Sequence, residues 1–127
     1  MIVVDASAAL AALFNDGPAR QTLGGEQLHV PHLVDSEVAS GLRRRVAAGH
    51  VTETDGLAAL NVWRRLAMTR YAIHPLLDRV WELRNNLTVY DAGYVALAEA
   101  LDCALVTADA RLVGAPGTRC TITIVPR

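Results

Sequence analysis

The chain opens with MIVVDASA (residues 1–8), and these eight residues already indicate the fold class. Ile2, Val3 and Val4 are three consecutive β-branched apolar residues, a pattern typical of a strand buried on both faces of a parallel sheet. Asp5 follows at once, although so buried a strand would not normally run into a carboxylate. Asp5 therefore either caps the following helix or stands at the mouth of a site that needs negative charge.

The rest of the chain alternates between strand-like and helix-like segments. We expect strands at Ile2–Asp5, Leu28–Val30, Arg70–Ile73, Ala104–Thr107 and Ile122–Val125, and helices at Ser7–Phe14, Ala19–Leu23, Leu33–Ala48, Thr52–Leu66, Leu76–Leu87 and Asp91–Leu101. This alternation predicts an α/β fold with a largely parallel sheet. No linker, repeat or low-complexity segment interrupts it, so we expect one domain over residues 1–127.

Composition narrows the functional classes. Hydrophobic residues make up 52% of the 127 positions, which favours a folded core, and the net charge of −1 gives no global attraction to nucleic acid or membrane. No secretory signal is visible, and the longest apolar stretch, Ala6–Phe14, is half the length that spans a bilayer. We therefore expect a cytoplasmic protein without a membrane partner.

Carboxylates recur at the ends of the expected strands. Asp5 follows the first strand, Glu37 lies early in the helix after the second, Asp91 opens a helix, and Asp109 follows the strand Ala104–Thr107. Ligands of such folds bind outside the carboxyl ends of the strands, near the point where strand order reverses. Four acids from four separate segments are therefore expected at one edge of the sheet.

Each acid also has a structural explanation. Asp5 and Asp91 could be helix caps, Asp109 a turn residue and Glu37 a solvated helix residue. Caps do not explain convergence, because two carboxylates about 4 Å apart repel by roughly 4 kcal/mol at an effective dielectric of 20. A cluster of oxygen ligands suits Mg²⁺ or Mn²⁺, which can activate a water for attack at phosphorus.

The absence of lysine discriminates among α/β enzymes that carry such acids. All twelve basic residues are arginine, so the chain lacks the Gly-Lys-Ser/Thr of a P-loop and the lysine that receiver domains and haloacid-dehalogenase-like phosphatases place beside their aspartate. It also has no Gly-x-Gly-x-x-Gly for a dinucleotide. A hydrolytic centre built from carboxylates and a metal ion remains.

Four stretches of the sequence together carry a resemblance to a known family. Asn86–Glu99 (NLTVYDAGYVALAE) followed by Leu105–Leu112 (LVTADARL) resembles the PIN domain, and more narrowly the VapC ribonuclease toxins of bacterial toxin–antitoxin pairs. Val3–Ala8 and the middle stretch with Pro31 and Ser36-Glu37-Val38 fit the same family in order and spacing. The match covers essentially the whole chain, and the combination of motifs is specific where any one would be weak.

The resemblance implies a fold and a set of site residues. Members adopt a three-layer α/β/α sandwich around a mostly parallel sheet. The family's acids, which bind the metal and serve catalysis, correspond here to Asp5, Glu37, Asp91 and, at its more variable fourth position, Asp109. Ser7 and Thr107 stand where the family often keeps hydroxyls beside the acids, and we assign them supporting hydrogen bonds.

The resemblance also implies an activity and partners. It predicts a metal-dependent endoribonuclease toxin that uses Mg²⁺ or Mn²⁺ to hydrolyse RNA phosphodiester bonds, pairs as a homodimer and is neutralised by a cognate antitoxin. A PIN scaffold that binds RNA or a partner without cutting, and a DNA nuclease, remain alternatives.

The arginines suggest where RNA could bind. Arg84 and Arg111 are the nearest basic residues in sequence to the acidic motifs, and we interpret them as candidate contacts for substrate phosphates. The run Arg43-Arg44-Arg45 spreads around a helix, so its members cannot all face one partner. They are either a solvated face or contacts for RNA or an acidic partner.

The two middle helices suggest where a partner could bind. Leu33–Ala48 and Thr52–Leu66 carry much apolar surface for a small domain, and we expect a partner helix to fill a groove between them. Replacing Leu42 or Leu60 by aspartate should then block the antitoxin.

Overall fold

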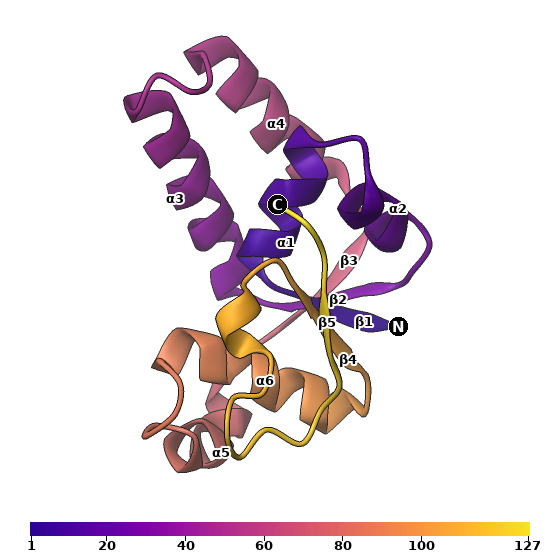
Figure 1. Ribbon diagram of the computed structural model, residues 1–127, viewed down its shortest axis with the longest axis vertical. Helices are drawn as coiled ribbons and strands as arrows, with labels where there is room; N and C mark the ends of the chain where they lie inside the picture. The colour runs from indigo at the N-terminus through magenta and orange to yellow at the C-terminus, as the bar shows by residue number, and fades with distance from the viewer.

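The computed structural model describes all residues from 1 to 127 and is built around one parallel sheet (Figure 1). The sheet has the order β3-β2-β1-β4-β5, and every neighbouring pair is parallel. Its strands are β1 (Ile2–Val4), β2 (Leu28–Pro31), β3 (Met68–Tyr71), β4 (Ala104–Thr107) and β5 (Ile122–Ile124). The expected α/β fold with a parallel sheet is confirmed.

Helices cover both faces of this sheet. They are α1 (Ala6–Phe14), α2 (Pro18–Gly24), α3 (Leu33–Ala47), α4 (Glu53–Arg65), α5 (Leu77–Glu82) and α6 (Val89–Leu101), with 3-10 turns η1 (His74–Leu76) and η2 (Ala110–Leu112). In Figure 1, α1 and α2 lie on one side of the strands and α5 and α6 on the other, which gives the expected three layers. None of these helices combines the length and the apolar character needed to cross a membrane.

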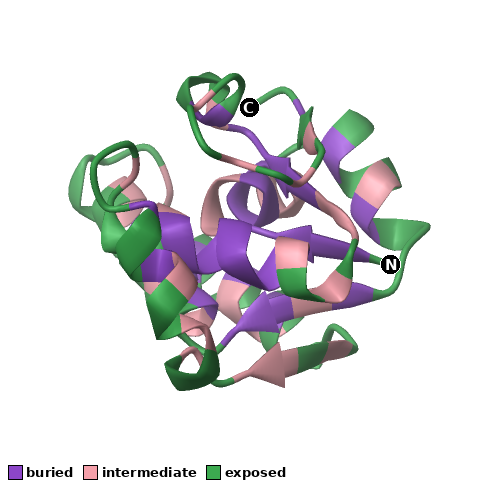
Figure 2. Cartoon of the chain, turned by 90° about the horizontal axis from the view of Figure 1, so that it is seen from below, coloured by how far each residue is buried: buried purple, intermediate pink, exposed green.

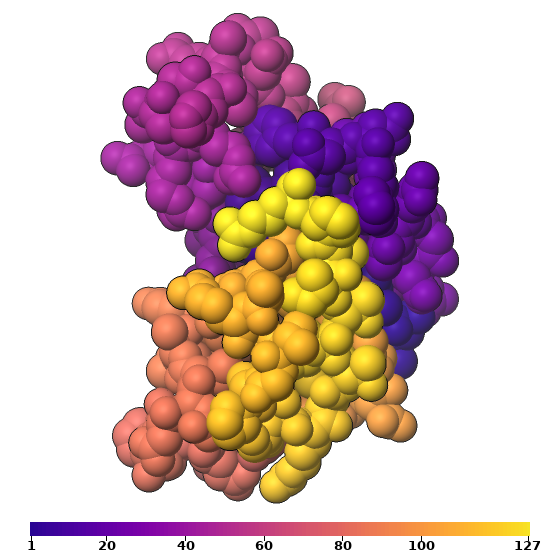
Figure 3. Space-filling model, viewed as in Figure 1, coloured from indigo at the N-terminus to yellow at the C-terminus, as the bar shows by residue number.

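The core is formed by the neighbouring strands β1 and β4 and the helices packed on them. Val3, Val4 and Leu105 are fully buried, which explains the β-branched run at the start of the chain. Figure 2 shows the buried residues gathered in these strands and in the helix faces that meet them. The helices α3 and α4 pack on each other as a helical hairpin (Figure 1), which forms a lobe that protrudes beside the start of the chain (Figure 3).

The close packing of α1 on α3 depends on a glycine. A Cβ added at Gly41 would overlap Cδ1 of Leu10 on α1, so any larger residue at this position would force the Leu10 side chain or the helix to shift. Gly41 is itself buried. This contact therefore determines how closely α1 and α3 approach each other.

Three expected boundaries were wrong, each for a local reason. The strand β3 lies two residues earlier than the expected strand Arg70–Ile73. Met68–Tyr71 pair in register with β2, whereas Ile73 has left the sheet and lies beside Gly93 of α6. The helix α5 ends at Glu82, well before Leu87, since the amide of Leu83 is shared between two carbonyls and the chain continues in turns. The helix α6 begins at Val89, because Thr88 and not Asp91 caps it.

The order of the strands reverses at β1, which is where a ligand site is expected in such a fold. β1 lies at the centre, with the chain leading to β2 on one side and β4 on the other. Val4 pairs with Val106 at the carboxyl ends of β1 and β4. Asp5 and the segment after Thr107 therefore leave the sheet together at the switch point of the fold.

Candidate functional site

Asp5 serves both roles that the sequence left open. It is the N-cap of α1, where Oδ1 accepts a hydrogen bond of 2.9 Å from the amide of Ala8. Its side chain also lines a cleft with a volume of about 830 Å³. A cap needs only one carboxylate oxygen, so the second oxygen of Asp5 remains available to the cleft or to neighbours.

Two hydroxyls hold the Asp5 carboxylate. Ser7 donates to Oδ1 at 2.7 Å, and Thr107 at the end of β4 donates to Oδ2 at 2.5 Å. Ser7 Oγ accepts from the amide of Ala108, and Thr107 Oγ1 accepts from the amide of Asp109. The expected hydrogen bonds from Ser7 and Thr107 are thus present, and they fix Asp5 against the strand on the other side of the switch point.

Asp91 faces the same cleft from α6. Because Thr88 provides the cap, with its Oγ1 accepting from the amide of Asp91 at 3.1 Å, the carboxylate of Asp91 is not needed to begin the helix. It stands in the first turn of α6 and lines the cleft beside Asp5. The cap interpretation of Asp91 is therefore wrong.

Glu37 reaches the cleft from α3 and is held by a tyrosine. Tyr94 on α6 donates a hydrogen bond of 2.7 Å from its phenol to Oε1 of Glu37. Tyr94 is 2% exposed, so its hydroxyl has little freedom to turn elsewhere. Tyr94 was not predicted, although it lies one turn after Asp91 and hence on the same helix face.

Asp109 is the fourth acid of the cleft, and its carboxylate is paired with an arginine. Asp109 caps η2 through the amide of Arg111, and the Arg111 guanidinium binds both carboxylate oxygens, with Nη2 at 2.7 Å from Oδ2. The side chain of Arg111 is largely exposed, so this ion pair is open to solvent and to exchange.

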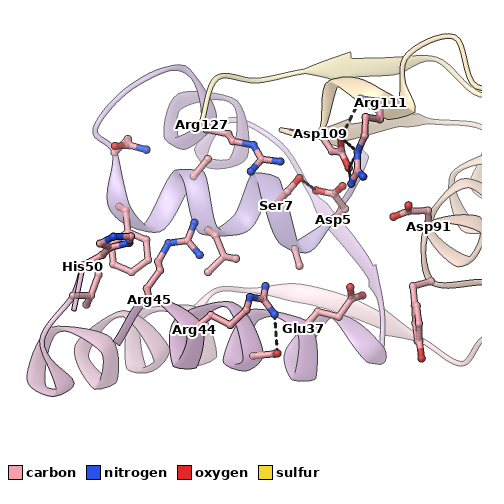
Figure 4. Close-up of a pocket in the computed structure, with 18 residues that line it drawn as sticks. Asp5, Ser7, Glu37, Arg44, Arg45, His50, Asp91, Asp109, Arg111 and Arg127 are labelled. Carbon is pink, nitrogen blue, oxygen red and sulfur yellow. Dashed lines mark hydrogen bonds and ion pairs between the residues drawn. The ribbon is translucent and has the colours of Figure 1, made fainter. Parts of the chain in front are cut away.

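The four predicted acids line one cleft (Figure 4). Burial raises the pKa of Asp5, of Glu37 and of Asp91 above the usual range of a carboxyl group, and repulsion from neighbouring carboxylates adds to the rise. Arg111 instead lowers the pKa of Asp109. Three of the acids therefore carry negative charge that no basic side chain neutralises by an ion pair.

The donor set suits a hard divalent cation, but not every donor points at one position. The cleft offers carboxylate oxygens only, with no thiol or imidazole beside them at the acidic end, which is the chemistry that Mg²⁺ and Mn²⁺ prefer. As the side chains stand, no three histidine, cysteine, aspartate or glutamate residues are close enough to hold one ion. Asp109 is paired with Arg111, so metal binding at Asp109 would have to compete with that ion pair, whereas Tyr94 binds only Oε1 of Glu37 and leaves the other oxygen free.

Of the two arginines predicted to contact substrate phosphates, only one lines the cleft. Arg111 reaches the cleft, but the structure does not bring Arg84 there: its guanidinium lies over the Trp81 ring at 4.6 Å from the centroid. Arg44, Arg45, His50 and Arg127 line the cleft instead. Arg127 comes from a segment far away in sequence, and nothing near the acidic motifs pointed to it.

Comparisons with known proteins agree with this geometry. The family model of the PIN domain matches residues 2–117. Ribonuclease VapC9 of Mycobacterium tuberculosis (strain ATCC 25618 / H37Rv) is 64% identical over 127 residues, which cover 100% of both proteins.

Solved structures share the fold. PAE2754 from Pyrobaculum aerophilum superposes with a TM-score of 0.70 and 25% identity over 97% of this chain and 83% of its own. A chain of a toxin–antitoxin complex from Klebsiella pneumoniae gives a TM-score of 0.64 and 20% identity over 92% of this chain and 94% of its own.

Proposed function

Since the chain belongs to the PIN-domain family, among the VapC ribonucleases, we propose that it is a metal-dependent endoribonuclease toxin that a cognate antitoxin neutralises. The observation that carries this proposal is the convergence of Asp5, Glu37, Asp91 and Asp109 on one cleft at the switch point of the sheet. Three of these carboxyl groups have raised pKa values and no basic partner, so the cleft favours a bound cation.

The residues that would hold Mg²⁺ or Mn²⁺ are these four acids. The ion, when bound, supplies a Lewis acid that neutralises charge on the scissile phosphate and lowers the pKa of water. Asp5 is the fixed member of the set, because Ser7, Thr107 and the amide of Ala8 hold both of its oxygens.

The remaining residues position the reaction. Water attacks phosphorus, the bond to the 3′ oxygen breaks, and the products are a 5′-phosphate and a 3′-hydroxyl. We assign the proton of the attacking water to a carboxylate oxygen of the cleft. Asp91 is the candidate, because no side chain other than Thr88 holds its carboxylate. Tyr94 keeps Glu37 directed into the same cleft.

RNA end mapping tests the activity. Wild type, Asp5→Asn and Asp91→Asn are expressed without antitoxin, and new RNA ends are mapped with their end chemistry across the transcriptome. We expect discrete cuts with 5′-phosphates in wild type only. Asn caps a helix about as well as Asp, so Asp5→Asn should remain folded. Asp91 does not cap α6, so Asp91→Asn should remain folded as well, and circular dichroism checks both variants.

Other outcomes identify the alternatives. Cyclic-phosphate ends would show attack by the ribose 2′-hydroxyl and contradict the proposed chemistry. No RNA cut by a folded wild-type protein, with a DNA strand cut in the presence of Mn²⁺, would identify a DNA nuclease. Binding to RNA without any cut would identify a scaffold.

The antitoxin is proposed to bind the groove between α3 and α4. This groove has a volume of about 380 Å³ and is lined mostly by apolar side chains, among them Leu42, Val46, Leu57 and Leu60. An amphipathic partner helix would bury these residues. Leu42 is 5% exposed and belongs to the core, whereas Leu57 is 60% exposed, so Leu57→Asp is the cleaner variant.

Co-expression tests this surface. Leu57→Asp should remain toxic in the presence of the antitoxin, and Val62→Asp on the exposed side of α4 should stay neutralised. Neutralisation of Leu57→Asp would place the antitoxin elsewhere. We also propose a homodimer, as the family resemblance implies, which sedimentation analysis of the purified protein checks.

A further inference from the structure

The cleft has two ends of opposite charge. Figure 4 shows the carboxylates gathered at one end and Arg44, Arg45, His50 and Arg127 along the other. Arg44 and Arg45 come from α3, and Arg127 comes from the segment after β5, so the basic end is formed by two walls far apart in sequence. The run Arg43-Arg44-Arg45 of the sequence supplies only the wall formed by α3.

The arginines of this end have no acidic partner. Arg44 donates to Oγ of Ser40, Arg45 to the carbonyl of Gly41 and Arg127 to the carbonyl of Ala108, and none of them forms an ion pair. Burial lowers the pKa of Arg45, and the positive charges of Arg44 and Arg127 lower it further. Three like charges therefore face one another across a cleft, an arrangement that an anion between them would stabilise.

Arg44 and Glu37 stand at different heights along α3. They are seven residues apart, which is about 10.5 Å between their backbone positions along the helix axis. The basic end of the cleft thus adjoins its acidic end along the same helix. A strand whose scissile phosphate lies at the acids would bring a neighbouring phosphate to the arginines.

Helix geometry explains why only part of the Arg43–Arg45 run takes part. Arg44 and Arg45 line the cleft, whereas Arg43 lies on the other side of α3, toward α4. Arg43 and Arg44 thus carry the same charge, lie on the same helix and are similarly exposed, but they have different surroundings. The chain itself supplies a matched pair for an experiment.

We propose that Arg44 and Arg127 form a backbone subsite that binds a phosphate of the RNA strand next to the scissile one, with Arg45 adding positive charge behind them. This inference rests on the proposed function and names the part of the cleft that retains the strand. Guanidinium groups suit this task because their planar N–H forks match phosphate oxygens and keep their charge at any physiological pH. The subsite reads the backbone and carries no sequence information by itself.

Salt-dependent RNA binding tests the subsite. A fluorescein-labelled single-stranded RNA 12-mer is titrated with the Asp91→Asn protein, which binds without cutting, over a series of KCl concentrations. Removing one arginine that binds a phosphate of a single strand should reduce the slope of log K against log salt by about 0.7. We expect this reduction for Arg44→Gln and for Arg127→Gln, about 1.4 for the double variant, and no change for Arg43→Gln.

The outcomes separate this inference from the proposed function. Equal slopes for Arg43→Gln and Arg44→Gln, in variants with unchanged thermal melting, would overturn the subsite while cleavage by wild type upholds the enzyme. The expected slopes without any cleavage by wild type would uphold the subsite and overturn the nuclease. Loss of polyglutamate binding in Arg44→Gln and Arg127→Gln, with RNA binding intact, would assign these arginines to an acidic protein segment and overturn the proposal.

Discussion

The phenol of Tyr94 on α6 and the carboxylate of Glu37 on α3 are joined by a hydrogen bond of 2.7 Å, which links residues 57 positions apart at the edge of the acidic cleft. The burial of Tyr94 fixes one side of this bond, and the carboxylate is the side that can move. Glu37 is thus positioned by a residue from the helix that also supplies Asp91. The pair connects packing of the core with the orientation of a proposed metal ligand.

Replacing Tyr94 by phenylalanine should weaken metal binding more than it weakens the fold. The loss of one hydrogen bond is expected to lower the free energy of unfolding by about 1 kcal/mol. Removal of an outer partner of a metal ligand typically reduces metal affinity by roughly tenfold or more. Mn²⁺ titration followed by electron paramagnetic resonance measures the affinity, and chemical denaturation measures the stability.

Tyr71→Phe is the matched control. Tyr71 also makes one hydrogen bond through its phenol, to Nδ1 of His29 at 2.6 Å, but it is not among the residues that line the cleft. It should lose similar stability and keep full Mn²⁺ affinity. Unchanged Mn²⁺ affinity in Tyr94→Phe would show that Tyr94 is a packing residue only.

Asp91→Asn should stabilise the metal-free protein. Burial and the charges of Asp5 and Asp109 raise the pKa of Asp91, so ionising this carboxyl group costs more free energy in the folded chain than in the unfolded one. Removing that charge should raise Tm by a few degrees, since about 1 kcal/mol corresponds to roughly 3–5 °C for a chain of this size. Asp16→Asn, at an exposed position just after α1, should leave Tm unchanged.

The same variant should lose its response to Mn²⁺. A ligand at 100 times its dissociation constant stabilises the folded state by about 2.7 kcal/mol, so wild type should melt at a higher temperature in excess Mn²⁺. Thermal scans with and without the ion measure both effects. A wild-type level of Mn²⁺ stabilisation in Asp91→Asn would remove Asp91 from the metal ligands.

Asp35 should control the stability of the helical hairpin at acid pH. Two nitrogens of Arg70 bind its carboxylate at 2.7 and 2.8 Å, and Trp63 donates to it at 2.8 Å, which ties α3 to α4 and β3. The hydrogen bonds from Arg70 lower the pKa of Asp35 below its ordinary value of 3.8. A lowered pKa means that this stabilisation is present above about pH 3.8 and is lost as pH falls through the folded-state value.

Urea denaturation as a function of pH measures this contribution. Asp35→Asn should lower the stability at pH 7 and flatten the decline of stability below pH 4. Arg70→Gln, which removes the same pair from the other side, should produce the same flattening. An acid decline as steep as that of wild type in both variants would assign the effect to other carboxyl groups.

Gly41→Ala should disturb the cleft by moving one of its walls. The added Cβ would meet Leu10 at 2.4 Å, and such overpacking costs about 1–3 kcal/mol. Gly24→Ala, where no atom lies within 4 Å of the new Cβ, should be neutral or slightly stabilising. Tm and cleavage rate are measured for both, and retention of both quantities in Gly41→Ala would show that α1 and α3 can separate without consequence.

The sequence predicted the parts of the fold that local patterns encode. Continuous β-branched residues located β1. The helix expected from Thr52 is α4, which Thr52 caps by accepting from the amide of Asp55 three residues later. The same spacing occurs at Thr88 and Asp91, and it marks the start of α6 in the structure. Reading Asp91 as a possible cap was wrong because the threonine before it already served that role.

The acids were predictable and their partners were not. Asp5, Glu37, Asp91 and Asp109 follow from the ends of elements and from the family resemblance. Tyr94 appears in sequence as one more apolar position of a buried helix, and only the approach of α3 reveals what its hydroxyl binds. Arg127 reaches the cleft through the pairing of β5 with β4, a long-range contact that no local spacing reports.

The parallel register of β1 with β4 has a consequence for the synthesis of the protein. Asp5 emerges from the ribosome 102 residues before Thr107, which carries one of the two hydroxyls that hold it and ends the neighbouring strand β4. The cleft therefore does not exist in a nascent chain until Asp109 has also emerged. A nascent chain therefore carries its four acids without an assembled cleft while most of the chain is being made.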